Sequence, residues 1–425
     1  MAKTELKSVI TCDMEGRIET ISKGSEKIFG YQEDELIGKK RVSIFSPGET
    51  VLEHVPTWLK TASEEGEFHT ETVFVRKDGS PIPAKIRITP TFRDGVQIGY
   101  CGITEVLEDK TPQEVAPEIS FLTKMFTWLV ITRAPFLTAV ILPILIGGAW
   151  AGYHLPAESV SWPNFWLALV AGIALHISAN VFNDYFDWTS GTDQLNNDYF
   201  LPYSGGSRSI ELGLADEKLL RRFATISLLV SGAIGLYLAF TSGFGVLLFG
   251  LAGAFMAYFY TAPPLRLAAR KGLGELSIGL SFGPLATAGT VYAISGSADL
   301  SSFLVGVPIG FLTILILWIN QFPDEEADKL AGKTNLVVVL GKQKARWGYL
   351  LILVLSFGLL AYWALTGLLP ALTLLTLLLI PLAAYSSWVV LREYAQRTLV
   401  RANVATIRLQ AFFGLIMAAA IFFAG

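Results

Sequence analysis

Two groups of Asn and Asp residues, each at the end of a long apolar stretch, carry the clearest chemical pattern in this sequence. The first begins at the end of the apolar residues 165–182 and continues beyond them. If a helix continues through it, residues three, four and seven apart share a face, and His176 falls on the same stripe. Carboxylates at the end of a membrane-length helix are costly and mark a functional site by default. We call this group the first ladder: Asn180, Asn183, Asp184 and Asp187, with Asp193 shortly after.

The second ladder follows the apolar residues 303–319 and consists of Asn320, Asp324 and Asp328. Its spacing of four and four places the three side chains on one helical face. Either ladder alone is also explained by a helix end with solvated acids. The repeated spacing from Asn to Asp in both ladders disfavours that explanation and predicts one shared site.

Two more polar stretches supply small residues, aromatic rings and cations. Residues 203–213 form a Gly and Ser loop with Ser204 and Arg208, in which small residues allow close backbone approach and the guanidinium suits a phosphate. Residues 258–275 carry Tyr260 and Arg266, and Lys333 follows the second ladder. For each basic residue alone, the alternative is a determinant of membrane topology at the lipid headgroups.

Acids and bases gathered in this way favour a site where a divalent metal meets a polyanion. Mg²⁺ prefers oxygen ligands and is usually held by a few carboxylates together with substrate phosphates. We expect it to bind between the ladders and to stabilise charge on a departing diphosphate. The expected metal ligands are Asn183, Asp184, Asp187, Asp193, Asn320, Asp324 and Asp328. The expected diphosphate-binding residues are Asn180, Ser204, Arg208, Arg266 and Lys333.

Composition divides the chain into a charged part and an apolar part. The whole chain is 52% hydrophobic, yet residues 1–118 contain 21 Asp and Glu and 15 Lys and Arg, against 15 and 18 in the rest. This favours a soluble domain joined to a membrane domain. Its first residues form no apolar secretory segment, so we expect a cytosolic domain with Cys12 and Cys101 reduced. No basic run is typical of nucleic-acid binding.

The apolar part contains nine segments near the ~20 residues that cross a bilayer. The loops near 154–163, 241–243, 295–301 and 366–367 hold no Lys or Arg, whereas the alternate loops hold 15. Basic loops stay in the cytoplasm, so we expect the amino terminus and both ladders on the cytoplasmic side of the cell (inner) membrane. The expected spans are 135–153, 164–184, 218–240, 243–261, 273–294, 302–322, 346–365, 368–390 and 403–424.

Residues 1–107 resemble a PAS domain, an α+β fold with an antiparallel sheet and short helices. The resemblance rests on Phe29-Gly30-Tyr31, on Arg76 to Ser80 and on Gly99 to Glu105. It implies sensing or partner contacts, including a PAS-mediated dimer, but fold alone assigns no role. No pattern assigns a PAS ligand: no Cys lies between Cys12 and Cys101 for a flavin-type photosensor, and His54 is more typical of a surface residue than of a haem ligand. We expect a polar linker at 108–118 and an interfacial helix at 119–134.

Residues 135–425 resemble the UbiA superfamily of intramembrane prenyltransferases. Both ladders match its two Asp-rich motifs, and Ser204 to Arg208 and Gly332-Lys333-Thr334 also match. The resemblance implies an all-α bundle of nine transmembrane helices that binds Mg²⁺ and an isoprenoid diphosphate at its cytoplasmic mouth. In the mechanism it implies, Asp187 and Asp324 act through the metal, and an aromatic ring attacks the allylic cation. Aromatic faces stabilise such cations, which suits Tyr260 or Tyr185.

The long spacer at 188–192 and residues 272–289 look most like the branch that prenylates 1,4-dihydroxy-2-naphthoate in menaquinone biosynthesis. Other branches place a base four residues after the tyrosine, where this chain has Pro264, with Arg266 two residues further on. Alternative acceptors are 4-hydroxybenzoate, a chlorophyllide or an archaeal glycerol lipid. A transporter or membrane sensor is the alternative of another class, but it would carry charges through the bundle midplane, and residues 346–365 and 368–390 hold no acids.

Overall fold

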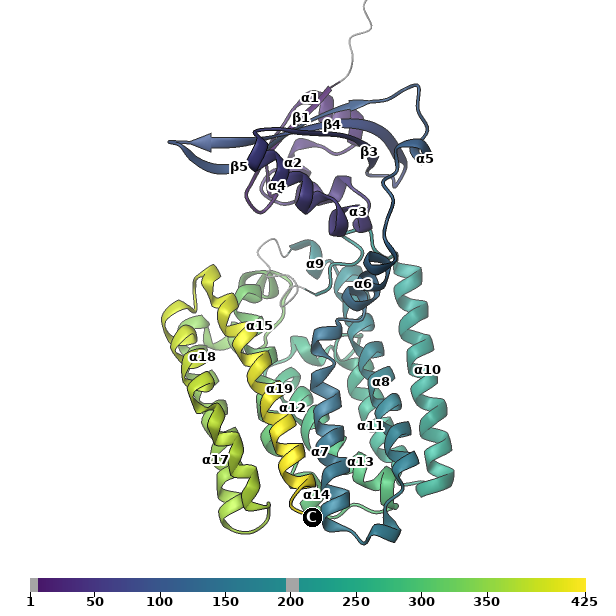
Figure 1. Ribbon diagram of the computed structural model, residues 1–425, viewed down its shortest axis with the longest axis vertical. Helices are drawn as coiled ribbons and strands as arrows, with labels where there is room; N and C mark the ends of the chain where they lie inside the picture. The colour runs from purple at the N-terminus through teal and green to yellow at the C-terminus, as the bar shows by residue number, and fades with distance from the viewer. Residues whose placement is uncertain (1–6, 196–205) are drawn as a thin grey trace, which may run out of the picture. The chain divides into compact units, whose positions relative to one another are not determined.

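The computed structural model describes residues 7–195 and 206–425. Its contacts divide the chain into two compact units (Figure 1). The N-terminal unit contains the residues up to Ile131 together with Arg208–Asp216, and the membrane unit contains Thr132–Ser207 and Glu217–Gly425. A short segment from the apolar half of the sequence therefore belongs, by its contacts, to the N-terminal unit.

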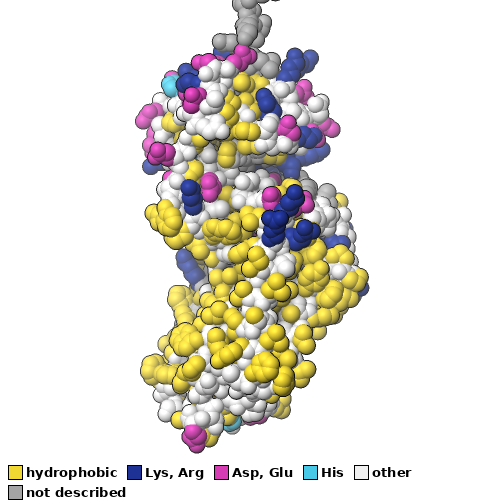
Figure 2. Space-filling view, turned by 90° about the vertical axis from the view of Figure 1, so that its right-hand side faces the viewer, with side chains coloured by type: hydrophobic (Ala, Val, Ile, Leu, Met, Phe, Trp, Pro, Cys, Tyr) yellow, Lys and Arg dark blue, Asp and Glu magenta, His cyan; other side chains and the backbone are white. Residues whose placement is uncertain are grey.

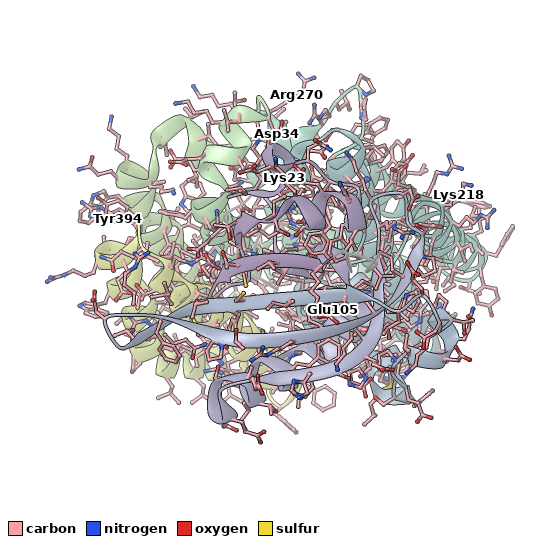
Figure 3. All side chains as sticks on the ribbon, turned by 90° about the horizontal axis from the view of Figure 1, so that it is seen from above. Lys23, Asp34, Glu105, Lys218, Arg270 and Tyr394 are labelled. Carbon is pink, nitrogen blue, oxygen red and sulfur yellow. The ribbon has the colours of Figure 1, made fainter. Side chains whose placement is uncertain are left out.

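The N-terminal unit is built on a five-stranded antiparallel sheet with the order β2-β1-β5-β4-β3. Gly16, at φ 78°, closes the turn between the first two strands, and Lys77-Asp78-Gly79 lies in the turn that joins β3 to β4. Figure 3 looks onto this unit, with Glu105 on the sheet and Lys23 and Asp34 on its helical side. The strands are β1 (Lys7–Asp13), β2 (Ile18–Ile21), β3 (Phe68–Val75), β4 (Pro81–Arg93) and β5 (Val96–Val106).

Short helices pack aromatic residues onto one face of this sheet. Phe29 is the last residue of its helix, and the following Gly30 adopts a φ of 79°, which costs glycine no strain because it has no Cβ. The ring centroid of Phe29 lies 4.3 Å from that of Phe45. Burial raises the pKa of the Cys12 thiol to about 11, so this cysteine stays protonated at neutral pH. The helices are α1 (Lys23–Phe29), α2 (Glu33–Leu36), η1 (Val42–Phe45), α3 (Gly48–Glu53) and α4 (Val55–Glu65).

The segment after the sheet is more ordered than a free linker. It contains α5 (Pro112–Val115), which contacts β3 and β4 and buries Val115. The next helix, α6 (Phe121–Ile131), exposes apolar side chains, among them Phe121, Leu122 and Phe126, each more than half exposed. The expected helix is present, and its place at a membrane interface stays a prediction.

The described residues of the membrane unit contain eight helices that are long and apolar enough to cross a membrane. The sequence predicts nine spans. The stretch expected at 243–261 folds as α11 (Val246–Phe259), whose 14 residues are about 21 Å long, short of a hydrocarbon core of about 30 Å. The eight are Ala134–His154, Trp162–Thr189, Glu217–Ser242, Leu273–Ser295, Leu300–Leu330, Lys342–Leu365, Ala371–Glu393 and Arg397–Phe422.

Several of these spans combine shorter elements. The helices that matter for the site are α8 (Trp162–Thr189), α15 (Val307–Leu330) and α12 (Leu273–Leu280), which continues through a π-helical turn (Ser281–Leu285) into α13 (Ala286–Ser295). The others in this unit are α7 (Thr138–His154), α9 (Thr192–Leu195), α10 (Glu217–Ser242), α14 (Leu300–Leu304), α16 (Leu336–Leu340), α17 (Lys342–Leu365), α18 (Ile380–Glu393) and α19 (Val400–Phe422).

Helix packing in the membrane unit uses small residues where backbones meet. A Cβ at Gly283 would lie 2.6 Å from the Gly306 carbonyl oxygen, and one at Gly310 would lie 2.6 Å from that of Gly279. Close approach of this kind is how helices associate in lipid, where apolar side chains gain little from leaving the solvent. The outer surface of this unit is broadly apolar, as Figure 2 shows for one face, and includes exposed Phe240 and Leu365.

Candidate active site

The first ladder lies on α8, which continues through the motif to Thr189 as the spacing requires. Asn180, Asn183 and Asp187 line a cavity of about 390 Å³, and Asn183 donates a hydrogen bond to Asp187 at 3.1 Å. Asp184 is not among the lining residues. Its carboxylate is 4% exposed and accepts a hydrogen bond from the backbone of Ser207 at 3.2 Å, so it anchors residues 206 and 207.

The second ladder lies on α15 and faces the same cavity with Asn320, Asp324 and Asp328. Pro323 lies inside this helix without ending it. Neighbouring amides orient two of the three side chains. Asn403 donates to Asn320 Oδ1 at 2.8 Å, and Asn335 donates to Asp328 Oδ2 at 2.8 Å. The prediction that both ladders contribute to one cavity therefore agrees with the geometry.

Lys333 lies between the two ladders. Its Nζ is 3.4 Å from Asp187 Oδ1 and 3.2 Å from Asp328 Oδ1. The turn after α15 places it there, because Gly332 adopts a φ of 72° and the Lys333 backbone donates to the Asp328 carbonyl. Burial alone would lower the pKa of this ammonium, but the carboxylates of Asp187 and Asp328 outweigh burial and raise it. Lys333 therefore stays charged at the cavity mouth.

Arg133 is a site residue that the sequence analysis missed. Its Nη1 donates to Asn183 Oδ1 at 3.1 Å, its guanidinium lies over the Phe136 ring at 5.1 Å, and it lines the cavity. The main-chain carbonyl beside it, that of Thr132, accepts from Asn180 at 3.3 Å. The available signal was a cation directly before Ala134-Pro135, where the first span begins.

Glu275 is a second residue that sequence reasoning missed. Its Oε1 accepts hydrogen bonds from Gln321 Nε2 at 3.1 Å and from the Leu336 backbone at 2.9 Å, and its side chain is buried on α12. A buried carboxylate with two donors ties α12 to α15 and α16. It thereby supports the helix that carries the second ladder without facing the cavity itself.

The remaining predicted residues fall in different places. Tyr260, at the end of α11, lines the cavity, as do Asp193 and Gly206. Arg208 belongs to the N-terminal unit and pairs with Glu211 at 2.9 Å. Arg266 adopts a φ of 44° in the turn before Leu267 and is not among the lining residues, and Ser204 lies outside the described residues.

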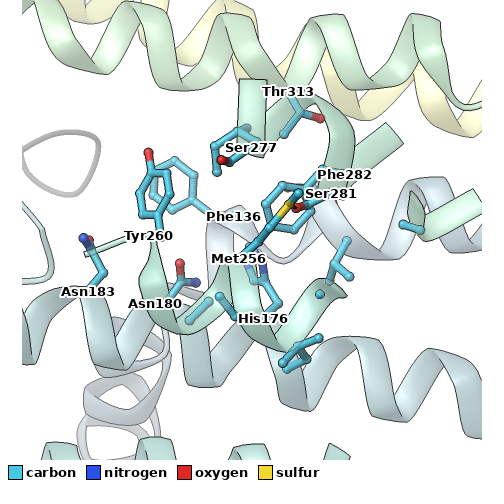
Figure 4. Close-up of a pocket in the computed structure, with 18 of the residues that line it drawn as sticks. Phe136, His176, Asn180, Asn183, Met256, Tyr260, Ser277, Ser281, Phe282 and Thr313 are labelled. Atoms are coloured by element: carbon cyan, nitrogen blue, oxygen red, sulfur yellow. Dashed lines mark hydrogen bonds between the residues drawn. The ribbon is translucent and has the colours of Figure 1, made fainter. Parts of the chain in front are cut away.

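The cavity changes character from its mouth to its interior. Figure 4 shows Asn183, Asn180 and Tyr260 along one stretch of wall, followed by Met256, His176 and Phe282. Beyond them the lining is mostly apolar, with Val140, Ile144 and Leu238 among its residues. A charged mouth that leads into an apolar interior suits a ligand with an anionic head and a hydrocarbon tail.

The oxygen donors at the mouth suit a hard divalent cation. Among the described residues, no three His, Cys, Asp or Glu side chains converge on a preformed metal site. Mg²⁺ is usually bound by one or two carboxylates together with waters and substrate phosphates, so incomplete protein coordination fits this ion. Both ladders offer carboxylate and amide oxygens to one cavity, and the donor set therefore fits Mg²⁺ bound with a diphosphate.

The structure thus combines membrane-length helices with an apolar cavity that has two acidic ladders and cations at its mouth, an arrangement that suits an intramembrane enzyme with an amphiphilic, anionic substrate. Residues 140–419 match the UbiA prenyltransferase family, and residues 6–112 match a PAS domain. The chain belongs to the UbiA family, carries an N-terminal PAS domain and is a prenyltransferase. It is an integral, multi-pass membrane protein.

Named relatives agree with this family. The chain is 31% identical over 253 residues to the 1,4-dihydroxy-2-naphthoate octaprenyltransferase of Mycobacterium tuberculosis, covering 57% of this chain and 82% of that one. It is 26% identical over 233 residues to the enzyme of the same name from Bacillus subtilis, covering 55% and 70%. A UbiA homologue from Archaeoglobus fulgidus, solved with GPP and Mg²⁺, shares the fold at TM-score 0.51 and 18% identity, covering 70% and 99%.

Proposed function

We propose that this protein transfers a polyprenyl group from an isoprenoid diphosphate to 1,4-dihydroxy-2-naphthoate, a step of menaquinone biosynthesis. The observation that carries the proposal is one cavity with both acidic ladders and Lys333 at its mouth and apolar walls behind them. The names of the relatives support this acceptor. The resemblance of residues 272–289 to that branch, noted in the sequence, supports it as well. The apolar interior takes the prenyl tail.

The protein's own residues bind and orient the diphosphate. The ammonium of Lys333 and the guanidinium of Arg133 pair with its oxygens, and Asn180 adds a neutral donor at the same wall. The residues that would hold Mg²⁺ are Asn183, Asp187, Asp193, Asn320, Asp324 and Asp328. When bound, this ion neutralises charge on the departing diphosphate. The aromatic face of Tyr260 stabilises positive charge on the allylic carbon, and the apolar wall excludes water from it.

We also propose an orientation with the mouth and the PAS domain in the cytoplasm of the cell membrane. If α11 crosses the bilayer, Arg266, Arg270 and Lys271 join the other basic loops on one side, as the positive-inside pattern favours. That makes nine crossings. Cysteine labelling of intact cells tests it: a cysteine placed at Lys271 should react only after permeabilisation, and labelling from outside would contradict the topology.

We further propose that the PAS domain modulates the rate. Its α3 packs against the segment Arg208–Asp216, because Gly48 approaches Leu212 and Leu214, and Lys40 Nζ lies 3.9 Å from Glu211 Oε1. This segment directly follows Ser207, whose backbone binds Asp184 of the first ladder. A ligand or a PAS-mediated dimer that shifts α3 would therefore act on the chain next to the site.

The function is tested with purified protein in lipid vesicles, Mg²⁺, a labelled prenyl diphosphate and a panel of acceptors. We expect prenylated naphthoate that has lost its carboxylate. In excess chelator we expect no product. A product on 4-hydroxybenzoate, on a chlorophyllide or on a glycerol lipid, with naphthoate untouched, would replace the proposed acceptor. Full turnover in excess chelator would contradict the metal site.

A further inference from the structure

His176 is a buried polar side chain in the cavity wall to which the proposed diphosphate chemistry gives no role. It lies on α8 one turn before Asn180, lines the cavity and is 6% exposed. Within the described residues, neither of its ring nitrogens forms a hydrogen bond. The main chain of Phe136 interacts with the ring, but without standard hydrogen-bond geometry. Figure 4 shows His176 in the wall beside Met256.

Three hydroxyl groups in this wall are satisfied within the protein. The hydroxyl of Thr313 donates to the Ile309 carbonyl at 2.9 Å, that of Thr290 to Ala286 at 2.7 Å and that of Ser277 to Leu273 at 2.6 Å. A buried polar group without a partner costs about 1–3 kcal/mol, which a bound ligand recovers if it supplies the partner. A hydrocarbon tail cannot do so.

The surroundings of His176 suit a planar aromatic ligand. Phe282 packs edge-on against its ring, with centroids 5.0 Å apart, and also lines the cavity. Phe282 lies in the π-helical turn that interrupts the α12–α13 span, with non-helical φ of −96° and ψ of 16°. Such turns occur frequently at functional sites. Phe136 and Tyr260 add two more rings to the same wall.

The distance along α8 leaves room for an acceptor ring between His176 and the diphosphate residues. At 1.5 Å per residue, seven residues place His176 about 10 Å from Asn183 along the helix axis. A ring in this interval has one edge toward the allylic carbon and the other toward the imidazole. The alternative is a core histidine that packs on Phe282 and meets no ligand.

We infer that His176 hydrogen-bonds a ring hydroxyl of the aromatic acceptor and sets which ring carbon faces the allylic carbon. The inference rests on the proposed function in that it assumes a hydroxylated aromatic acceptor, of which 1,4-dihydroxy-2-naphthoate is one. It assigns His176 to acceptor binding, and leaves the diphosphate to the residues at the mouth.

The experiment compares His176→Leu and His176→Gln with wild-type protein in vesicles. His176→Leu should raise the KM for the acceptor about tenfold and leave the KM for the prenyl diphosphate unchanged. His176→Gln, whose amide still forms a hydrogen bond, should recover part of the loss. The matched control is Gln410→Leu on α19, because Gln410 is fully buried with no partner among the described residues for either amide atom, and it lies outside the cavity lining.

A naphthoate without ring hydroxyls, used as a competitive inhibitor, separates hydrogen bonding from packing. Its inhibition constant should be equal in wild type and His176→Leu. An unchanged acceptor KM in His176→Leu, or a raised KM for the prenyl diphosphate instead, would overturn the inference. If wild-type protein prenylates a different phenolic ring, the proposed acceptor fails and the same comparison with that ring still decides the role of His176. If it prenylates no aromatic ring, the inference fails as well.

Discussion

At the cavity mouth, the cations Lys333 and Arg133 offset the negative charge of the ladder carboxylates in the absence of a ligand. Lys333 lies within 3.4 Å of a carboxylate from each ladder, and Arg133 holds the amide of Asn183. Without these cations, carboxylates of two helices would face each other in a poorly solvated space, which is costly. In the proposed function, the same cations pair with the diphosphate when it enters with its metal.

The backbone at Gly206 leaves no room for a side chain. It adopts a φ of 78°, and an added Cβ would lie 2.9 Å from Asp184 Oδ1. Gly206→Ala should therefore displace the segment that Asp184 anchors, at a strain of about 1 kcal/mol or more, and lower kcat/KM at least about tenfold. Initial rates in vesicles measure this effect. Gly232→Ala on α10, where no atom lies within 4 Å of the added Cβ, is the control. Equal losses in both variants would contradict the local explanation.

Residue types and spacing predicted the two ladders because helical periodicity fixes which residues share a face. The sequence could not predict that Asp184 turns from the cavity to the Ser207 backbone, since this depends on where the later loop returns. It also missed Arg133 and Glu275, whose roles depend on contacts with helices far along the chain. Arg208 matched a motif, yet it pairs locally with Glu211.

At the scale of elements, α8 and α15 position the ladders, and α12 holds α15 in register through Glu275 and Gln321. Hydropathy predicted the order of the apolar segments, because a span needs about 20 apolar residues. Among the described residues, eight of the nine expected spans are helices long enough to cross a membrane. Hydropathy overestimated α11, whose helix ends at Phe259. Composition predicted a polar linker at 108–118, and within this segment α5 buries Val115 against the sheet.

The α12–α13 span approaches the α14–α15 span closely at glycines. Gly283→Val would push its side chain against the Gly306 carbonyl and the Gly310 backbone. Overpacking of this kind costs about 1–3 kcal/mol, so the variant should unfold at a lower temperature in detergent. It should also lose activity, because α15 carries the second ladder. Gly358→Val on α17, with no neighbour within 4 Å of the added Cβ, should unfold like wild type. A Gly283→Val protein as stable as wild type would show that the close approach is dispensable.

At the scale of the whole molecule, the chain passes from one unit to the other three times, after Ile131, Ser207 and Asp216. Arg208–Asp216 comes from the prenyltransferase part of the sequence, yet it makes its contacts in the N-terminal unit. Sequence periodicity could not predict which unit this segment contacts, because a polar loop has no regular apolar pattern. Arg208–Asp216 therefore lies inside the UbiA match at residues 140–419, outside the PAS match at residues 6–112, and still belongs to the N-terminal unit.

Two variants test this coupling. A chain that begins at Pro117 should insert and retain transferase activity at an altered rate, because the proposed ligands all lie beyond residue 130. In the full chain, Gly48→Val should alter the rate in the same direction, since its side chain would collide with Leu212 and Leu214. Gly102→Ala, whose Cβ meets only ordinary contacts, is the control. Kinetics identical to wild type in both the shortened chain and Gly48→Val would leave the PAS domain only a tethering role.

A double-mutant cycle on turnover tests whether both ladders form one site. Asp187→Asn on α8 and Asp324→Asn on α15 each preserve size and remove one carboxylate from the cavity lining. Each single variant in vesicles with Mg²⁺ should lose turnover by about a thousandfold or more, while inserting and unfolding like wild type. The double variant should be hardly worse than either single one, because residues that act as a unit are not additive. Near-normal turnover in either single variant, or losses that simply multiply in the double variant, would contradict a shared site.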